Sequence, residues 1–423
     1  MQRSVESNVV LKRMPRVCIL TETFYPVVGG GETHARLLAE RLNKSGVKTF
    51  VLTRRSSRKY GRTGEIDGTQ IYRTPPCGMK RFGKYLMVPF VLQQLFRLRN
   101  EYDVIFVCGY RILGIPAVIA AGILKKPCVL RAEGLGEMSG NYASAYKKLP
   151  LLVDQGFSAW IGCRNRVLKK ADAFVSISKP VADEFLDSGI SPEKVHLIPN
   201  GIDLNVFSPV DASKKSELRA QLKLPNNAFI AAYSGKLNQG KGLEHLLSAW
   251  KTLACKYDNI HLVLIGSGGG QSLSCEDDLR AFVKEHKLDD KVTFTGYVTN
   301  VCRYLQASDI FVFPSENEAQ GIALIEAMAC GLPSIASDTG GIPEIVQNGI
   351  NGILVEPGCS DAITQSIEKI IDTPSLIEKL GSRARESVCS RYSMDSVASR
   401  YIELFGSLMP GISRQSQPAD GLS

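Results

Sequence analysis

The sequence lacks the long apolar segments of membrane-spanning and secreted proteins. Its longest apolar run extends from Gly114 to Leu124, whereas a helix needs about 20 apolar residues to cross a bilayer. The N-terminal segment MQRSVESNVVLKRM has no apolar centre of the kind found in signal peptides. We therefore expect a cytoplasmic protein.

Cysteine is present, but not in patterns that bind metal or form disulfide frameworks. The eleven cysteines are an odd number, and they form no C-x-x-C pair and no cluster with histidine. Most of them, including Cys18 and Cys108, lie in strand-like runs, which is typical of small buried apolar residues. We expect neither a disulfide framework nor a zinc site.

Length and charge indicate two domains of different character. A chain of 423 residues is too long for one ordinary core and suits two domains of roughly 200 residues each. The net charge of +9 is uneven, because residues 1–200 hold 31 Lys and Arg against 16 Asp and Glu, and the remainder holds 20 against 26. The basic first half is therefore expected to face something anionic.

The basic stretch from Lys80 to Arg99 mixes cations with Phe, Tyr, Leu, Met and Val. One interpretation is a surface helix with an apolar core face. The other is docking to an anionic membrane surface, where each basic residue contributes about 1 kcal/mol. Nucleic-acid binding is not expected, since no interleaved aromatic platform or known binding motif is present.

Short β-rich runs alternate with longer helical patterns, which predicts parallel sheets wound with helices. A first series of strands is expected within residues 16–20, 48–53, 103–109, 127–134, 173–178 and 195–201. A second series is expected within residues 228–235, 260–268, 291–296, 309–315 and 333–338. The polar stretch Ser208–Asn227 between the two series is the expected linker region.

In wound α/β sheets, ligands bind beyond the carboxyl ends of the strands. After the first strand of the second series, the loop SGKLNQGKG places glycines around Lys236 and Lys241. Two ammonium groups in a glycine-rich loop suit a diphosphate, because glycine allows close backbone approach. The same pattern also occurs in ordinary loops.

The fourth strand of the second series leads into FPSENEAQGIALIEAMACGLP. Glu318 is expected at the strand tip, and Gln320, Gly321 and Ile322 are expected to open a helix that carries Glu326. Free amides at a helix N-terminus bind phosphate, and the two carboxylates could accept hydrogen bonds from sugar and ribose hydroxyls. Taken singly, Glu318 could instead cap the helix and Glu326 could be a solvated carboxylate.

The complete set of motifs resembles the retaining glycosyltransferases of family 4, which have the GT-B fold. The family signature is two glutamates separated by seven residues, the spacing of Glu318 and Glu326. The resemblance covers residues 16–408 and includes GGGETHARLLAERL, PNGID, SGKLNQGKGLEHLLSAW, LVLIGSG, VTFTGYV, EAQGIALIEAMACGLPSIASDTGGIPEIV and NGILVEPG.

The resemblance implies an α/β fold of two Rossmann-like, wound parallel-sheet domains that face a central cleft. It implies an acceptor-side domain at residues 1–205 and a nucleotide-sugar-binding domain at 206–392. A C-terminal helix at 393–408 would cross back to the first domain, and composition indicates a disordered tail at 409–423.

The resemblance also implies the roles of particular residues. Glu318, Lys236 and Lys241 would be catalytic, with the lysines on the donor diphosphate and Glu318 on the transferred sugar. The implied donor-binding set is Gly30, Gly31, Lys236, Lys241, Gly266, Tyr297, Glu318, Gln320, Gly321, Ile322 and Glu326. The glycines at 29–31 would form a loop over the donor phosphates, and Glu326 would hold the ribose.

Two departures from the family pattern concern the same sites. Many members carry an aromatic residue in place of Gln320. Many also carry a histidine near the acceptor, where this sequence reads LRAEGLGEMSG with Glu133 and Glu137. Glu133 is a candidate acceptor-binding group or proton acceptor, or alternatively a loop carboxylate paired with Arg131. His34 is expected to be structural or on the acceptor side.

The expected function is retaining transfer of a sugar from a UDP- or GDP-linked donor to a glycan or lipid-linked acceptor. The resemblance implies no cofactor and no metal, in agreement with the absence of an Asp-x-Asp motif in a matching loop. The basic first half favours peripheral binding to the inner face of the plasma membrane. An inactive GT-B binding module is the main alternative, followed by an epimerase or phosphorylase on the same fold. A nicotinamide-dependent oxidoreductase is disfavoured, because GSGGGQ ends its G-x-G-x-x-G pattern in Gln271.

Overall fold

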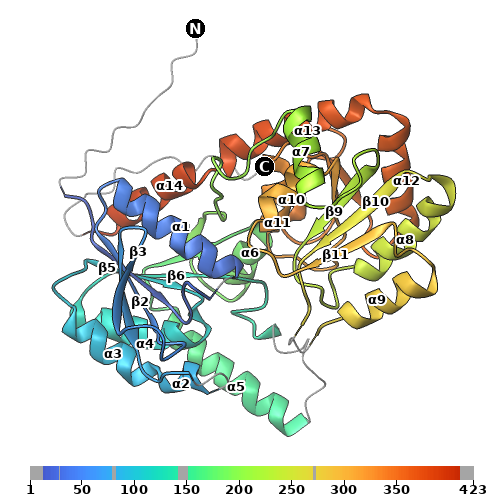
Figure 1. Ribbon diagram of the computed structural model, residues 1–423. Coiled ribbons are helices and arrows are strands. Elements are labelled where there is room, and N and C mark those ends of the chain that lie inside the picture. Colours follow the sequence, from blue (N-terminus) through green and yellow to red (C-terminus); the bar gives the residue numbers. More distant parts are fainter. Residues whose placement is uncertain (1–12, 28, 79–81, 142–150, 270–272, 410–423) are drawn as a thin grey trace. The chain divides into compact units, whose positions relative to one another are not determined.

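The computed structural model describes residues 13–27, 29–78, 82–141, 151–269 and 273–409 (Figure 1). The chain divides into two compact units. Unit 1 comprises the described residues of Met1–Ser176, Ala182–Ile198 and Val397–Ser423, and unit 2 those of Ile177–Val181 and Pro199–Ser396. Each unit is built around its own sheet.

Unit 1 contains an eight-stranded sheet in the order β3-β4-β2-β1-β5-β6-β7-β8. All neighbouring strands are parallel except β3 and β4, which are antiparallel. The strands are β1 (Val17–Thr21), β2 (Thr49–Arg54), β3 (Thr63–Ile66), β4 (Thr69–Thr74), β5 (Val104–Cys108), β6 (Cys128–Arg131), β7 (Ala173–Ser176) and β8 (Val195–Leu197). The central strands β1 and β5 are buried throughout, as continuous apolar runs in parallel sheets are expected to be.

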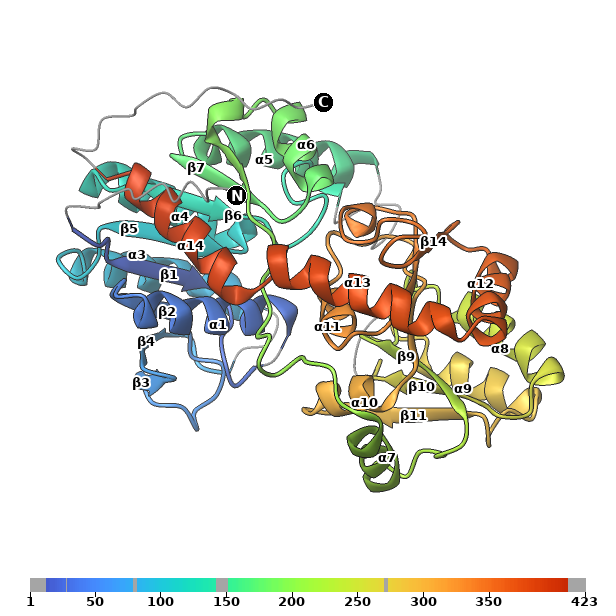
Figure 2. The same cartoon turned by 90° about the horizontal axis from the view of Figure 1, so that it is seen from above.

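Helices pack around this sheet and include one from the C-terminal part of the chain. They are α1 (Gly30–Lys44), α2 (Gly83–Leu86), α3 (Val88–Arg97), α4 (Tyr110–Leu124), α5 (Leu151–Leu168), α6 (Lys179–Asp187) and α14 (Met394–Ser407). Helix α14 covers the sheet of unit 1 (Figure 2). Its Tyr401 and Phe405 pack against Phe106 of β5, with ring centroids 5.1 and 5.4 Å apart. These aromatic contacts explain why the chain from Val397 onward belongs to unit 1.

Unit 2 contains a six-stranded, wholly parallel sheet in the order β11-β10-β9-β12-β13-β14. The strands are β9 (Phe229–Ser234), β10 (Ile260–Ile265), β11 (Val292–Gly296), β12 (Ile310–Phe313), β13 (Ser334–Ser337) and β14 (Ile353–Val355). The helices are α7 (Ala212–Gln221), α8 (Leu243–Lys256), α9 (Glu276–Glu285), α10 (Val301–Ala307), α11 (Ile322–Ala329), α12 (Ser360–Asp372) and α13 (Ser375–Arg391).

The expected linker at 208–227 is wrong. Within it Asp211 caps α7 by accepting a hydrogen bond from the Lys214 amide at 2.7 Å, and the helix packs against α10 of unit 2. The units change instead at Ile198/Pro199, seven residues before the expected domain boundary. Residues from Pro199 onward belong to unit 2 because Ile202 is hydrogen-bonded to the C-terminal part of that unit. The Ile202 amide donates to the Tyr392 carbonyl, and the Ile202 carbonyl accepts from the Met394 amide.

Other expectations can be compared with the described residues. Every expected strand is present, whereas β3, β4 and β14 were not predicted. All eleven cysteines are free; Cys18 and Cys108 are buried as expected, but Cys163 and Cys255 are exposed. No helix among the described residues could span a membrane. Nearly all of the predicted tail lies outside the described residues, which end at 409.

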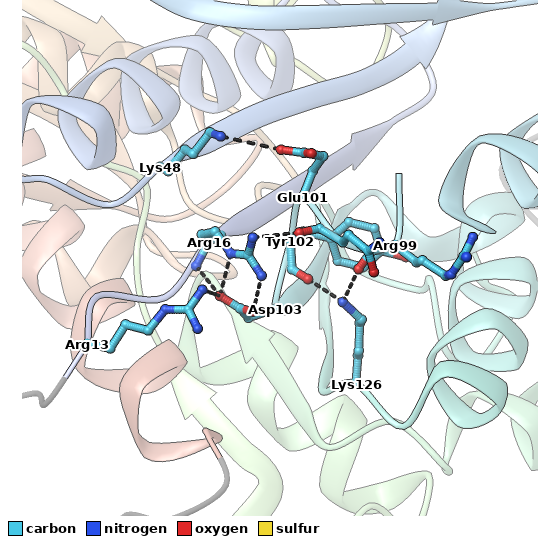
Figure 3. Close-up of polar contacts among 9 residues, drawn as sticks. Arg13, Arg16, Lys48, Arg99, Glu101, Tyr102, Asp103 and Lys126 are labelled. Carbon is cyan, nitrogen blue, oxygen red and sulfur yellow. Dashed lines mark hydrogen bonds and ion pairs between the residues drawn. The ribbon is translucent and has the colours of Figure 1, made fainter. Parts of the chain in front are cut away.

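Aspartates clamp the amino-terminal ends of three neighbouring strand pairs. Asp103, just before β5, donates its amide to the Arg16 carbonyl at 2.8 Å, and its carboxylate accepts from the Arg16 amide at 3.0 Å. The Arg16 guanidinium adds two further bonds to the same carboxylate at 3.0 and 2.7 Å (Figure 3). Arg16 thereby lowers the pKa of Asp103.

The same reciprocal pair of hydrogen bonds, in which the aspartate amide donates and its carboxylate accepts, recurs at two other aspartates that precede strands. Asp172 makes it with Cys128, joining the starts of β6 and β7. Asp309 makes it with Ile230, joining the starts of β9 and β12, and also accepts from Arg219 at 2.7 Å. Each carboxylate satisfies an amide that lies beyond the end of the strand ladder.

We predict that Asp103→Ala lowers the free energy of unfolding by about 1–3 kcal/mol, because it leaves the Arg16 amide without its acceptor and removes two of the three hydrogen bonds of the guanidinium. Glu101→Ala is the matched control, since its ion pair with Lys48 is exposed (51% and 68%) and spans 3.4 Å. The control should cost less than about 0.5 kcal/mol. Urea unfolding followed by circular dichroism measures both, and equal losses would contradict the clamp.

Candidate functional site

The candidate site in unit 2 lies where β9 and β12 are neighbours although distant in sequence. In the sheet, β10 and then β11 lie on one side of β9, whereas β12, β13 and β14 lie on the other side. Loops at the carboxyl ends of two such strands diverge and leave room for a ligand. The loop after β9 carries Lys236 and Lys241, and the loop after β12 carries Glu318.

The structure brings Lys241 and Glu318 together. Lys241 Nζ donates to Glu318 Oε2 at 2.7 Å, and the two side chains are 29% and 19% exposed. Lys236, in the same loop, is exposed and makes no ion pair within the described residues. The site thus holds one cation oriented by a carboxylate and a second cation in solvent.

Close backbone contacts fix the two loops. The Glu316 amide donates to the Gly240 carbonyl at 3.1 Å. Gly242 has φ +64°, and a Cβ there would lie 2.0 Å from the Pro314 carbonyl oxygen. Gly340 has φ +54°, and its Cβ would lie 1.9 Å from the Glu318 carbonyl oxygen. The backbone approaches closely at both positions, so both require glycine.

Helix α11 begins at Ile322, as the sequence predicts, with Gly321 as its N-cap at φ +95°. The first amides of a helix have no intrahelical acceptor and form an anion-binding end. The Gln320 side chain is buried and does not face a ligand. Its Oε1 accepts hydrogen bonds from the amide and the side chain of Asn200 at 2.9 and 2.5 Å. Gln320 therefore holds the PNGID segment against the start of α11.

Glu326 lies on α11, one turn after the helix start. Its side chain is half-buried, and the surrounding protein raises its pKa to about 8, chiefly by desolvation and secondarily through the charge of Cys302. A carboxyl group in this state is held neutral at pH 7, and it can both donate and accept a hydrogen bond.

The remaining predicted donor residues of unit 2 lie along the same sheet edge. Gly266, after β10, has φ +139°, and a Cβ there would lie 1.9 Å from the Gly235 carbonyl oxygen, so glycine is required. Tyr297 follows β11 and is 65% exposed. Residues 270–272, which include Gln271, lie outside the described residues.

In unit 1, the prediction that the glycines at 29–31 form a loop is wrong. Gly29 is the N-cap of α1, and Gly30 and Gly31 form its first turn. Glu133 lies against this turn, because Cβ atoms added at Gly31 and Gly109 would meet its carboxylate oxygens at 2.7 and 2.9 Å. A carboxylate at a helix N-terminus is favourably placed.

Glu133 is solvent-exposed, yet its pKa is raised, with desolvation as the largest cause; Arg131 opposes the rise and Glu32 adds to it. Arg131 itself is buried. His34 is buried in α1, and neither ring nitrogen has a hydrogen-bond partner among the described residues. Desolvation and the charge of Arg131 lower the pKa of His34, so its imidazole is neutral.

A network that the sequence did not reveal holds the loop after β6. The Glu184 carboxylate accepts from the amides of Gly136, Met138 and Ser139, each at 2.8 Å. Arg164, buried in α5, donates to the Glu137 and Met138 carbonyls at 2.7 and 3.0 Å. These partners are distant in sequence, so no local pattern could identify them.

Glu137, in the same loop, is 3% exposed, and burial raises its pKa to about 7. Arg111 approaches it at 3.5 Å, and its charge opposes this rise. Unit 1 thus presents an accessible carboxylate, Glu133, and a buried carboxyl group, Glu137, on one rigid loop.

One group among the described residues has the side chains to hold a metal ion. Ligand atoms of Glu244, His245 and Glu316 lie within 4.8 Å of one another. Two of the three side chains are exposed. Glu244 and His245 lie in the first turn of α8, just after the loop that carries Lys241, and Glu316 lies in the loop that carries Glu318, so metal dependence has to be tested directly.

Comparisons with known proteins match both units to glycosyltransferases. Residues 214–387 match the family model for glycosyl transferases group 1, and residues 28–206 match the model for glycosyltransferase family 4. An uncharacterized glycosyltransferase of Methanocaldococcus jannaschii, MJ1607, is 25% identical over 92% of this chain and 97% of its own. The D-inositol 3-phosphate glycosyltransferase 1 of Catenulispora acidiphila is 24% identical over 90% and 92%.

Among solved structures, Anabaena Alr3699/HepE in complex with UDP and glucose aligns with a TM-score of 0.74 at 20% identity. The alignment covers 93% of this chain and 100% of that one. At this level of identity the likeness shows the fold.

We predict that Glu326→Gln changes the pH dependence of stability. Because the folded pKa of about 8 exceeds the ordinary value of 4.5, the folded state retains a proton that the unfolded state loses between these values. The wild type should therefore lose stability relative to the variant as pH rises from 5 to 8. The free energy of unfolding can fall by at most about 1.4 kcal/mol per pH unit through one such group. The half-buried Glu326 side chain should contribute a fraction of that fall.

Urea unfolding at constant ionic strength measures this difference at pH 5, 6, 7 and 8. Parallel stability profiles for the wild type and Glu326→Gln would show that Glu326 titrates in the folded protein as it does in the unfolded chain.

Proposed function

The chain belongs to glycosyltransferase family 4, within the glycosyl transferases group 1, and has the GT-B fold; from that premise we propose a specific reaction. The enzyme moves a sugar, with retention at the anomeric carbon, from a UDP- or GDP-linked donor to a glycan or lipid-linked acceptor. The observation that carries this proposal is the Lys241–Glu318 pair beside the N-terminus of α11. The UDP and glucose named for the Anabaena protein support a nucleotide-sugar donor.

The charge that develops in the reaction fits the unit 2 site. Cleavage of the anomeric bond places negative charge on the departing diphosphate and positive charge on the sugar ring. Lys236, Lys241 and the amides at Gly321 and Ile322 stabilise the diphosphate as fixed positive groups.

The carboxylates take the other roles. Lys241 orients Glu318 through Oε2, so that Oε1 accepts from hydroxyls of the transferred sugar. Glu326 holds the ribose, and Gly266 and Tyr297 lie farther along the same sheet edge, toward the nucleoside. This division places charge stabilisation at the phosphates and orientation at the hydroxyls.

The acceptor hydroxyl attacks the face from which the diphosphate leaves, which is the origin of retention. Glu133 is the proposed acceptor-binding group, and its raised pKa brings a general base closer to neutral pH. The cationic clamp needs no metal ion. An inactive GT-B binding module would bind the nucleotide without turning over a donor, so turnover distinguishes the two functions.

A peripheral membrane location for polysaccharide or glycolipid synthesis is supported by α2 and α3. Val91 and Leu95 of α3 are buried, as the surface-helix interpretation requires. In the same region Phe82 and Tyr85 are 66% and 55% exposed, beside Lys84. Lys80 and Arg81 lie outside the described residues. Exposed aromatic side chains beside a partly exposed lysine favour an anionic lipid surface.

We predict that the enzyme releases nucleoside diphosphate from a UDP- or GDP-hexose and that Lys241→Met lowers kcat about 10²–10³-fold, because it removes charge from the leaving-group clamp. The kcat of Glu318→Gln should be lower than that of the wild type by a similar factor. EDTA and His245→Ala should leave the rate unchanged. An equal rate for Lys241→Met and the wild type, or a β-linked product from an α-linked donor by NMR, would reject the mechanism.

We predict that replacing Lys80, Arg81 and Lys84 with glutamate weakens sedimentation with phosphatidylglycerol vesicles in low salt, because the substitution reverses the charge that faces the lipid. Neutral vesicles should bind both proteins weakly.

The matched control reverses three exposed cations elsewhere in unit 1, Arg58, Lys59 and Arg62, with the same change in net charge. Equal weakening by both triple variants would show a net-charge effect, and unchanged binding of the first would remove the membrane proposal.

A further inference from the structure

An imidazole and two carboxylates converge at the carboxyl ends of β9 and β12. Glu244 and His245 lie in the first turn of α8, whereas Glu316 lies in the loop after β12. One ligand atom from each of the three side chains lies within 4.8 Å of the other two. The group therefore joins two segments of unit 2 that are distant in sequence.

The separation of two of these atoms matches that of two ligands on one zinc ion. His245 Nε2 and Glu316 Oε1 are 3.4 Å apart. Two ligand atoms at about 2.0–2.1 Å from a tetrahedral zinc ion lie about 3.3–3.4 Å from each other, whereas a hydrogen bond usually spans about 2.9–3.0 Å. Glu244 is exposed, so its side chain can rotate to bring its carboxylate into the same coordination shell.

The charges of the group also favour a divalent cation. Glu318, in the same loop as Glu316, is paired with Lys241. In the part of the chain that the structure describes, neither Glu244 nor Glu316 forms an ion pair with a lysine or an arginine. Two neighbouring negative charges repel each other unless a cation lies between them.

The backbones that carry the three side chains are already in contact. The Glu316 amide donates to the Gly240 carbonyl at 3.1 Å, and the Thr339 hydroxyl donates to the Glu316 carbonyl at 3.1 Å. Gly242, the N-cap of α8, approaches the Pro314 carbonyl oxygen too closely for a Cβ. Binding of an ion thus requires movement of side chains only, which favours a site on rigid elements.

We propose that Glu244, His245 and Glu316 bind one Zn²⁺ ion, which cross-links α8 to the loop after β12. Zinc accepts three protein ligands with water in the fourth position. Imidazole nitrogen suits zinc, whereas magnesium and calcium bind shells of oxygen atoms. The proposal does not depend on the proposed function, because the charge clamp on the leaving group consists of lysines and helix amides and turnover needs no ion at this group.

Calorimetric titration of the full chain with zinc chloride, in a buffer free of chelators, tests the site. The wild type should bind one more zinc ion per chain than His245→Ala or Glu316→Gln. In these variants the affinity at the group should fall at least about tenfold, because loss of a ligand costs no less than loss of a residue that supports a ligand. Magnesium chloride should bind the wild type at least about tenfold more weakly than zinc chloride does.

Thermal unfolding provides a second measurement. An ion that binds the folded state alone raises Tm, so zinc chloride should raise the Tm of the wild type more than that of either variant. EDTA should reverse this rise and leave turnover unchanged. Circular dichroism without metal confirms that the variants are folded.

His286→Ala and Glu285→Gln are the matched controls, since they remove the same types of side chain from the end of α9. Both should bind zinc as the wild type does. Undiminished zinc binding by His245→Ala and Glu316→Gln would place the ion elsewhere, for instance at the exposed Cys163 or Cys255, and would overturn the proposal. Equal affinity of the wild type for zinc and magnesium would overturn it as well.

Discussion

The adjacency of β9 and β12 is the constraint on which the rest of unit 2 depends. Parallel strands end at one edge of a sheet, so this adjacency brings together two loops that are distant in sequence. Asp309 maintains it from the opposite edge, by its reciprocal bonds to Ile230 and its ion pair with Arg219. The Lys241–Glu318 contact exists because both strands start from this clamp.

Unit 1 follows the same principle with other residues. Its sheet order changes direction between β1 and β5, and the Asp103–Arg16 clamp joins the starts of these strands. At the carboxyl edge, Glu133 fits against Gly31, in the first turn of α1, and against Gly109, the residue that follows β5. In both units an aspartate fixes the strand order at one edge, and glycines leave room for functional groups at the other.

The sequence predicted what local patterns encode. Continuous apolar runs located the buried strands, and the glutamate pair with its flanking glycine located the start of α11 and Glu318. The strands β3 and β14 escaped prediction because they are short and only partly buried. The polar residues 208–227 resembled a linker because α7 buries little besides Leu218 and Arg219.

Long-range contacts explain the other differences. No local pattern connects Glu184 with the loop after β6 or Gln320 with Asn200, because folding alone brings these residues together. The raised pKa of Glu326 likewise depends on the protein packed around it. A family resemblance supplied the roles of site residues, whereas the structure supplied their protonation and their partners.

Thermal unfolding with UDP, GDP and ADP, on the wild type and on Glu326→Ala, tests the central claim most directly. A ligand at a hundredfold excess over its Kd stabilises the folded state by about 2.7 kcal/mol. The account predicts a clear rise in Tm with UDP or GDP that Glu326→Ala abolishes. Absence of a shift with every nucleotide would contradict a nucleotide-sugar site at the β9–β12 edge.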